Sequence, residues 1–174
     1  MANSEHLKPR DTAVKVSYEH LISAPIDKVI SAYELDEFYI LKLKNSGATS
    51  VEVLEREELA GGRLRRKCRA SEPSRVPAML RKSDTDTYVD DNVLDRGLKV
   101  MTWKVTPHIM ADVFLLSGSV EFHPQGTQTK VVFNTLLEVK IPFVGGKAEK
   151  IGLEKTGEEV TRQVAFLKDW VAKH

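Results

Sequence analysis

The sequence predicts a single α+β domain in which a seven-stranded antiparallel sheet packs against a long C-terminal helix. Two observations carry this prediction. Apolar and polar side chains alternate over residues 14–22 and over six further segments between 48 and 141, which is the period of a strand. From Gly146 onward, apolar residues recur at helical spacing. No helical segment separates the six later strands, so neighbours in sequence are expected to pair as an antiparallel meander.

The N-terminal elements follow from local signals. The segment 1–12 is polar and is expected to be a flexible tail, with the folded domain covering 13–174. A strand is expected at 14–22, and a helix directly after it, because the missing N–H of Pro25 costs nothing near a helix start. A second short helix is expected at 35–43. The apolar face of the first helix is formed by Ile26, Val29, Ile30 and Tyr33.

The six later strands are separated by glycine and proline turns such as Gly61-Gly62 and Pro124-Gln125-Gly126. One connection is longer, because Pro73 and Pro77 are expected to break any strand between 71 and 82, and residues 78–81 are expected to form one helical turn. The strands are expected at 48–59, 63–70, 86–95, 98–106, 112–123 and 128–141.

Alternation also predicts which side chains face the helix. Most of them are ordinary core residues, but Gly118 removes bulk in mid-strand and Thr135 adds a hydroxyl, so we expect void space near the sheet centre. The predicted inward residues are Met101, Trp103, Val105, Phe114, Leu116, Gly118, Val120, Phe122, Val131, Phe133, Thr135, Leu137 and Val139.

One stripe of the C-terminal helix is predicted to face the sheet. Its first half is small and polar, and Gly157 in a helix interior costs roughly 1 kcal/mol relative to alanine. This glycine has two readings, a cavity wall or a close approach of the helix to a strand, and the stripe alone supports both. The stripe comprises Gly146, Glu149, Leu153, Thr156, Gly157, Val160, Val164, Leu167 and Val171.

Three local segments resemble a known superfamily. They are Ser23-Ala-Pro-Ile-Asp-Lys-Val29, Arg65-Arg66 leading into Val76-Pro-Ala-Met-Leu80, and Ile141-Pro-Phe-Val-Gly-Gly-Lys-Ala-Glu149. With the order of elements, they make residues 14–172 similar to the START and Bet v 1-like (SRPBCC) superfamily, most of all to an uncharacterised START-like family, a domain of unknown function. The resemblance implies a helix-grip fold, with the sheet wrapped around the C-terminal helix and an apolar cavity between them. It implies no particular ligand or reaction. Residues 71–75 depart from the pattern, being longer and more polar.

Charge and composition exclude several classes of function. The formal net charge is +1 and no aromatic residue interleaves the basic strand 63–69, which argues against nucleic-acid binding. Alternation turns most of that strand's cations outward, toward acidic residues of the preceding strand. Arg66 is predicted to face inward, where it must be paired by Glu149, a nearby aspartate or an acidic ligand. In the first turn of its helix, Glu149 is read either as a structural carboxylate or as a ligand contact.

The remaining chemistry-bearing residues form no recognised motif. The five histidines are not spaced with one another or with Cys68 as metal ligands, and no phosphate-binding loop or serine-nucleophile motif is present. We therefore predict no metal, no cofactor and no assigned catalytic residue, with His20 the alternative acid or base. Cys68 is expected to be a small core residue, and it excludes an internal disulfide.

The sequence thus predicts a binding protein for an apolar or amphipathic small molecule, such as a lipid, sterol or aromatic metabolite. Alternatives are a cyclase, aromatase or hydrolase using the same cavity, or a module that regulates another protein, which a filled core would favour. We expect a cytoplasmic monomer without a transmembrane segment. We expect no sequence-specific nucleic-acid partner, and transient contact with a membrane remains an alternative. The predicted ligand-binding residues are Arg66, Met101, Trp103, Phe114, Leu116, Gly118, Phe133, Thr135, Leu137, Glu149, Leu153, Gly157 and Val160.

Overall fold

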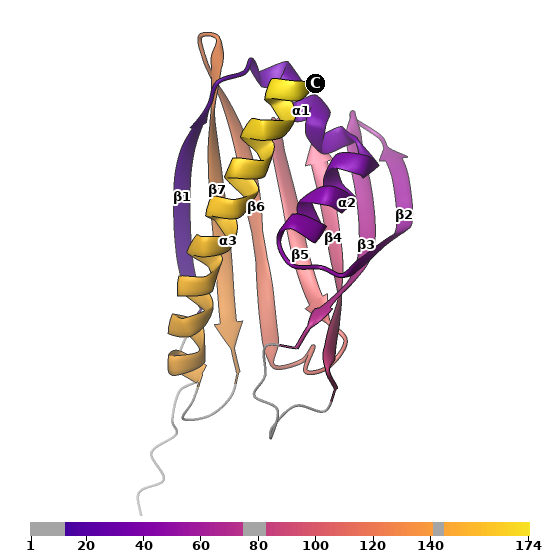
Figure 1. Ribbon diagram of the computed structural model, residues 1–174, viewed down its shortest axis with the longest axis vertical. Coiled ribbons are helices and arrows are strands. Elements are labelled where there is room, and N and C mark those ends of the chain that lie inside the picture. The colour runs from indigo at the N-terminus through magenta and orange to yellow at the C-terminus, as the bar shows by residue number, and fades with distance from the viewer. Residues whose placement is uncertain (1–12, 75–82, 141–144) are drawn as a thin grey trace, which may run out of the picture.

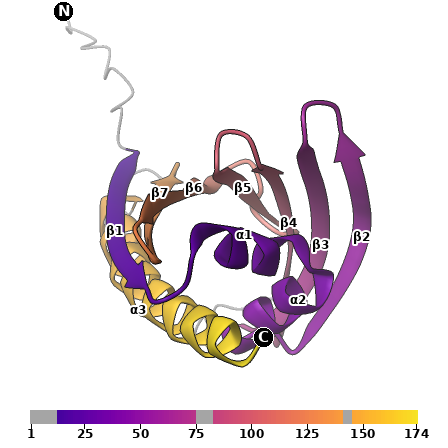
Figure 2. The ribbon, with the colours of Figure 1, turned by 90° about the horizontal axis from the view of Figure 1, so that it is seen from above.

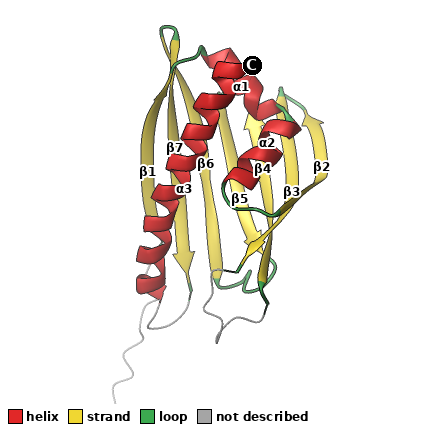
Figure 3. Ribbon diagram, viewed as in Figure 1, coloured by secondary structure: helices red, strands yellow, loops and turns green. Residues whose placement is uncertain are grey.

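The computed structural model describes residues 13–74, 83–140 and 145–174, without the side chains of 145–148 and 153. Its elements follow the predicted order, two short helices after the first strand and one long helix at the end (Figures 1 and 3). The helices are α1 (Ile26–Glu34), α2 (Asp36–Asn45) and α3 (Gly145–Lys173). The strands are β1 (Val14–Ile22), β2 (Ser50–Leu59), β3 (Arg63–Pro73), β4 (Thr85–Asp95), β5 (Val100–Pro107), β6 (Phe114–Gln125) and β7 (Gln128–Val139).

The strands form a seven-stranded antiparallel sheet with the order β1-β7-β6-β5-β4-β3-β2. From β2 to β7, each strand pairs with the next strand in the sequence. The first strand, β1, pairs with β7 and forms the sheet edge opposite β2. The sheet curves strongly, and all three helices lie on its concave side (Figure 2). The predicted fold class, a helix-grip sheet around a long C-terminal helix, is therefore confirmed.

Three details of the predicted elements are corrected or lie outside the described residues. The strand that was expected to end at residue 70 extends to Pro73, the last residue of β3, which pairs with Thr85. The reason is position, since a proline at a strand end removes only one ladder donor. The helical turn expected at 78–81 and the tail expected at 1–12 lie outside the described residues.

The inward alternation of the strands is confirmed by burial. On β3, Leu64, Arg66, Cys68 and Ala70 are buried while the residues between them are more exposed. On the outer face the cations pair across strands, Lys67 with Glu55 at 2.9 Å and Arg65 with Asp91 at 2.8 Å. Lys67 thus pairs with the preceding strand as predicted, whereas Arg65 pairs with the following strand, β4.

The core is densest where α1, α2 and the C-terminal half of α3 meet. Phe38 of α2 stacks on Phe166 and meets Trp170 edge-on, each at 5.4 Å between ring centroids. Tyr33 of α1 makes edge contacts with Phe38 and with Phe122 of β6, both at 5.1 Å. These aromatic contacts hold the two short helices against α3 and one end of the sheet.

Arg66 is the most unusual member of this core, because its side chain is only 1% exposed. Its Nε donates to Asp36 at 2.7 Å, and its terminal nitrogens donate to the backbone carbonyls of Tyr33 at 3.1 Å and Glu34 at 2.8 Å. Those carbonyls belong to the last turn of α1, where helical partners are lacking. The sequence-based requirement for a partner is met by an aspartate and by backbone.

We predict that Arg66→Met destabilises the fold by about 2–3 kcal/mol, because it leaves two helix-end carbonyls without their donors, while Asp36 stays partly exposed beside Arg56. Urea unfolding followed by circular dichroism measures the loss. Arg65→Met is the matched control on the outer face, where the charge pair with Asp91 is solvent-screened and its removal should cost much less. Equal unfolding midpoints for the two variants would contradict the structural role of Arg66.

Candidate functional site: a cavity between the sheet and the C-terminal helix

A cavity of about 740 Å³ lies inside the curved sheet. Its walls come from the inward faces of β4, β5, β6 and β7, the middle of α3 and the C-terminal part of α2. The volume falls in the range of ordinary small-molecule sites, roughly 300–1,000 Å³. The void expected from the sequence is therefore present.

The walls of the cavity are mostly apolar. Met101 and Trp103 of β5 line it together with Phe133 and Leu137 of β7, and Val160 of α3 also contributes. Thr135 adds a single buried hydroxyl to this wall, with 4% of its surface exposed. Such a wall gains from contact with hydrocarbon and offers few partners to water.

One end of the cavity is polar, and Tyr39 of α2 and Asp90 of β4 meet there. The Tyr39 hydroxyl donates to the Asp90 carboxylate at 3.0 and 3.2 Å, and Asn92 donates to the same carboxylate at 2.9 Å. Burial and the neighbouring Asp90 charge raise the pKa of Tyr39 well above its usual range, so Tyr39 stays a donor at neutral pH. Asp90 is 5% exposed, and its charge is held by hydrogen bonds.

Lys42 belongs to the same polar end. Its side chain lines the cavity with 6% of the residue exposed, and its Nζ lies 4.2 Å from the centre of the Tyr39 ring. Among the described residues, no hydrogen-bond acceptor or ion-pair partner reaches this Nζ. Burial lowers the pKa of Lys42, while the nearby carboxylates of Asp90 and Glu159 oppose that shift.

The far end of the cavity is formed by the segment between β5 and β6. His108, Ile109, Met110 and Val113 line it, and Ile109 and Met110 are 46% and 51% exposed. Met110 has a positive φ of 67°, an uncommon conformation for a residue with a side chain. Apolar side chains therefore reach partly exposed positions at this end, and polar residues beside them also line it, Glu72, Ser74, Ser83, Thr85, Asp86 and Thr87.

Eight of the thirteen predicted ligand-binding residues line the cavity. Seven come from β5, β6 and β7, as the alternation of inward residues predicted, and one comes from α3. The eight are Met101, Trp103, Phe114, Leu116, Phe133, Thr135, Leu137 and Val160. Leu153 has no described side chain.

Gly118 does not line the cavity, and its predicted contribution to the void is wrong. A Cβ at this position would overlap the carbonyl oxygen of Asn134 on β7 and lie 2.7 Å from the Trp103 ring. Glycine is needed here because backbone and indole already fill the space. Gly118 thus allows the backbone of β7 and the Trp103 ring to lie close to β6, and it leaves no room for a ligand.

Gly157 also does not line the cavity. This separates the two interpretations of the residue, a cavity wall or a close approach of α3 to a strand. A Cβ there would lie 3.0 Å from the hydroxyl of Tyr18 on β1. The glycine therefore lets α3 approach the edge of the sheet closely. The cavity-wall reading is wrong for this residue, although Gly152 and Thr156 of the same helix do line the cavity.

Arg66 and Glu149 are buried and each is held by a partner, but neither lines the cavity. The Glu149 carboxylate is 3% exposed and accepts a hydrogen bond from the backbone N–H of Val139 at 3.0 Å. It ties the first turn of α3 to the end of β7. The structural reading of Glu149 is therefore favoured over ligand contact, and the pairing of Arg66 with Glu149 is wrong because Asp36 holds the guanidinium.

Sequence reasoning missed Tyr39, Lys42 and Asp90. Lys42 stands between Leu41 and Leu43 in a helix of low amphipathic contrast, where a lysine looks like an ordinary solvated residue. Asp90 does stand on the inward face of β4 by the same alternation that identified Arg66. The available signal in the sequence was an aspartate at an inward position of an alternating strand.

Two further groups singled out in the sequence lie away from the cavity. His20 faces inward on β1 and meets Phe133 edge-on at 6.3 Å, and burial lowers its pKa. Cys68 is fully buried, and desolvation raises the pKa of its thiol to about 11, so it is neutral at pH 7. Within the described ranges, no cluster of His, Cys, Asp or Glu could hold a metal ion.

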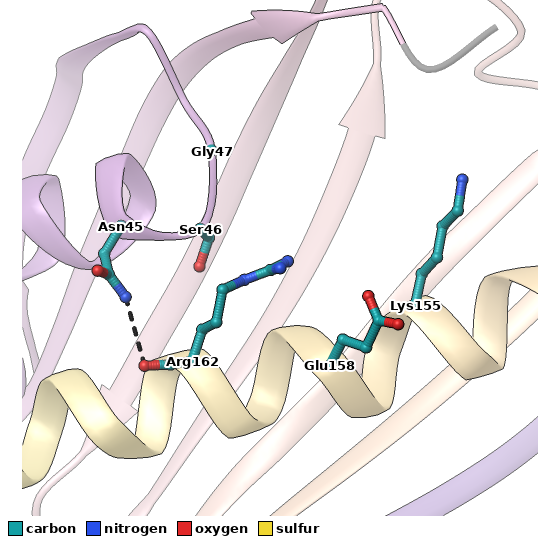
Figure 4. Close-up of a pocket in the computed structure, with 6 residues that line it drawn as sticks. All are labelled: Asn45, Ser46, Gly47, Lys155, Glu158 and Arg162. Carbon is teal, nitrogen blue, oxygen red and sulfur yellow. Dashed lines mark hydrogen bonds between the residues drawn. The ribbon is translucent and has the colours of Figure 1, made fainter.

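A second, open hollow of about 340 Å³ lies where the end of α2 meets α3 (Figure 4). Its α2 side is the turn 45–47, where Asn45 donates to the Arg162 carbonyl at 3.3 Å. Lys155, Glu158 and Arg162 form its α3 side. Lys155 lines both hollows, so the two are neighbours.

Solved structures with the same architecture include two enzymes and a START protein. The Zhui aromatase/cyclase from Streptomyces sp. R1128 has 14% identity and a TM-score of 0.67, over 92% of this chain and 94% of that chain. Norcoclaurine synthase from Thalictrum flavum has 12% identity and a TM-score of 0.65, over 93% and 88%. A START superfamily protein from Mycobacterium smegmatis has 16% identity and a TM-score of 0.61, over 91% and 97%.

The chain therefore shares the fold of structures that include a START superfamily protein, an aromatase/cyclase and Ara h 8.0201, as the resemblance of its sequence motifs implied. Residues 17–171 match the family described as "Protein of unknown function (DUF2505)", and the chain belongs to that family. Among proteins with curated functions, none matches the sequence. In the described part of the chain, no helix has the length and apolar character needed to cross a membrane.

The glycine geometry gives a direct test of the sheet packing beside the cavity. We predict that Gly118→Ala strongly destabilises the protein, since its methyl group would displace either the β7 backbone or Trp103. Gly97→Ala is the control, because a Cβ there meets only Asp95 at an ordinary 3.4 Å. Thermal unfolding measures both variants. A melting temperature for Gly118→Ala equal to that of Gly97→Ala would show that the strands can separate at no cost.

Proposed function

We propose that the protein binds an apolar or amphipathic small molecule in the cavity between its sheet and α3. The observation that carries the proposal is the 740 Å³ cavity with a largely apolar wall and a polar group formed by Tyr39, Lys42 and Asp90. Each buried CH₂ group of a ligand contributes about 0.8 kcal/mol in such a wall. A module that regulates a partner protein is less well supported, because a filled core was its expected signature.

The eight predicted residues that line the cavity are the proposed ligand contacts. Trp103 and Phe133 supply broad apolar surfaces, and Thr135 supplies a hydroxyl between them. Arg66 and Glu149 are withdrawn as orienting groups, because their polar atoms already bond to protein. Lys42 and Asp90 take their place at the polar end.

A neutral fluorescent probe, N-phenyl-1-naphthylamine, tests the proposal directly. Its emission should rise on binding, and Leu116→Phe should weaken that binding roughly tenfold because the larger ring occupies cavity volume. Leu115→Phe is the matched control, being the same change one residue earlier, on the other face of β6. The experiment measures probe titrations for wild type and both variants, with circular dichroism to check folding.

No binding of the probe to the wild type would argue against a ligand-binding function. Equal affinities of the two phenylalanine variants would argue that the probe binds elsewhere. Weakened binding confined to Leu116→Phe would place the probe in the cavity.

An enzyme acting in the same cavity is a second candidate. The specific observation is the Tyr39–Asp90 hydrogen bond beside Lys42, which puts three titratable groups at one end of the cavity. Two similar structures, the aromatase/cyclase and norcoclaurine synthase, are enzymes by description. Chemical conversion of a bound compound by wild type, lost in Asp90→Asn while binding persists, would favour this candidate. Recovery of every bound compound unchanged would favour binding alone.

A further inference from the structure

The polar end of the cavity holds a buried donor that lacks an acceptor. Lys42 is 6% exposed, and its Nζ reaches no acceptor among the residues that the structure describes. Its contact with the Tyr39 ring, at 4.2 Å, offers a π face but no lone pair. Because Lys42 lines the cavity and its ammonium has no acceptor in the described protein, an oxygen atom of a ligand can accept a hydrogen bond from it.

The same end also offers acceptors. The Asp90 carboxylate accepts from two donors, the Tyr39 hydroxyl, which is shared between its oxygens, and the Asn92 amide, and a carboxylate has about four lone-pair sites. Glu159 of α3 lines the cavity and accepts from Gln163 at 3.2 Å, which leaves its second oxygen available. A hydroxyl group can therefore accept from Lys42 and donate to a carboxylate.

The net charge of the side chains at this end determines which ligand head group it can accept. Lys42 stands against two carboxylates, Asp90 and Glu159, both of which act on its pKa. Arg66 is close as well, but it is paired with Asp36 at 2.7 Å, and the Cys68 thiol is neutral. The polar end is thus negative by one charge when Lys42 is protonated, and by two when it is not.

Two other charged side chains in the described part of the wall leave this excess unchanged. They are Asp86 and Lys155, which add one negative charge and one positive charge. An anionic head group would bring like charge into an enclosed, weakly screened space in either protonation state of Lys42. A neutral head group avoids that repulsion.

We propose that the cavity selects an otherwise apolar ligand whose head is an uncharged hydroxyl or carbonyl group, held by Lys42, and rejects the corresponding carboxylate. The inference rests on the proposed function, since it concerns the polar end of the same cavity. It narrows the ligand class to neutral oxygenated lipids, sterols or aromatic compounds. Free fatty acids fall outside that class.

Two probes that differ only in the head group test this selectivity. Wild-type protein is titrated with 1-pyrenebutanol and with 1-pyrenebutyrate at pH 7.5, and pyrene fluorescence reports both affinities. We expect the alcohol to bind at least tenfold more tightly than the acid. Glu159→Gln, which removes one of the negative charges, should narrow that ratio by raising the affinity for the acid.

Lys42→Met tests the donor. It should weaken 1-pyrenebutanol binding about tenfold while leaving N-phenyl-1-naphthylamine affinity unchanged, because that probe has no oxygen for Lys42 to hold. Lys44→Met, on the exposed side of the same helix, is the control and should change neither affinity. Lys42→Gln keeps a donor and should retain most of the alcohol affinity.

Equal or tighter binding of the acid in the wild type would overturn the inference. So would a Lys42→Met variant that binds the alcohol as well as Lys44→Met does. Loss of binding for all three probes in the wild type would instead reject the proposed function itself. The two failures are therefore distinguishable.

Discussion

The buried guanidinium of Arg66 is the interaction on which the arrangement of this protein depends. Three donors on one side chain hold the last carbonyls of α1 and the Asp36 carboxylate at the start of α2. The corner between the two helices is thereby fixed to the middle of β3. Because α2 starts at this corner, its direction brings Tyr39 and Lys42 to the cavity, and Tyr39 also packs against Arg66 at 4.8 Å.

The long C-terminal helix has two functions along its length. Its second half is buried core, where Val164, Leu167 and Trp170 pack against the short helices and the sheet. Its first half is tied at separate points, Glu149 to the backbone of β7 and Gly157 against Tyr18 of β1. Between those ties and the inner strands the space stays open, so the cavity follows from how α3 is anchored.

The sequence predicted the fold and the strand-derived part of the site because both depend on local periodicity. A period of two assigns Met101, Trp103 and Phe133 to the inner face without any tertiary information. It could not interpret Gly118, because a glycine that opens a void and one that admits a neighbouring carbonyl have the same pattern. Only the position of Asn134 across the sheet separates these cases. Lys42 was missed for a related reason: its burial depends on where α2 docks, which is a long-range consequence of Arg66.

Methyl NMR during a titration with N-phenyl-1-naphthylamine tests the central claim, that the cavity between sheet and helix is a ligand site, most directly. The account predicts chemical-shift changes at the methyl groups of Met101, Leu116 and Val160, which line the cavity. The methyl groups of Leu115 and Leu167, on the other face of β6 and in the closed core, should stay unchanged. Shifts confined to surface methyl groups, or no shifts at a saturating probe concentration, would contradict it.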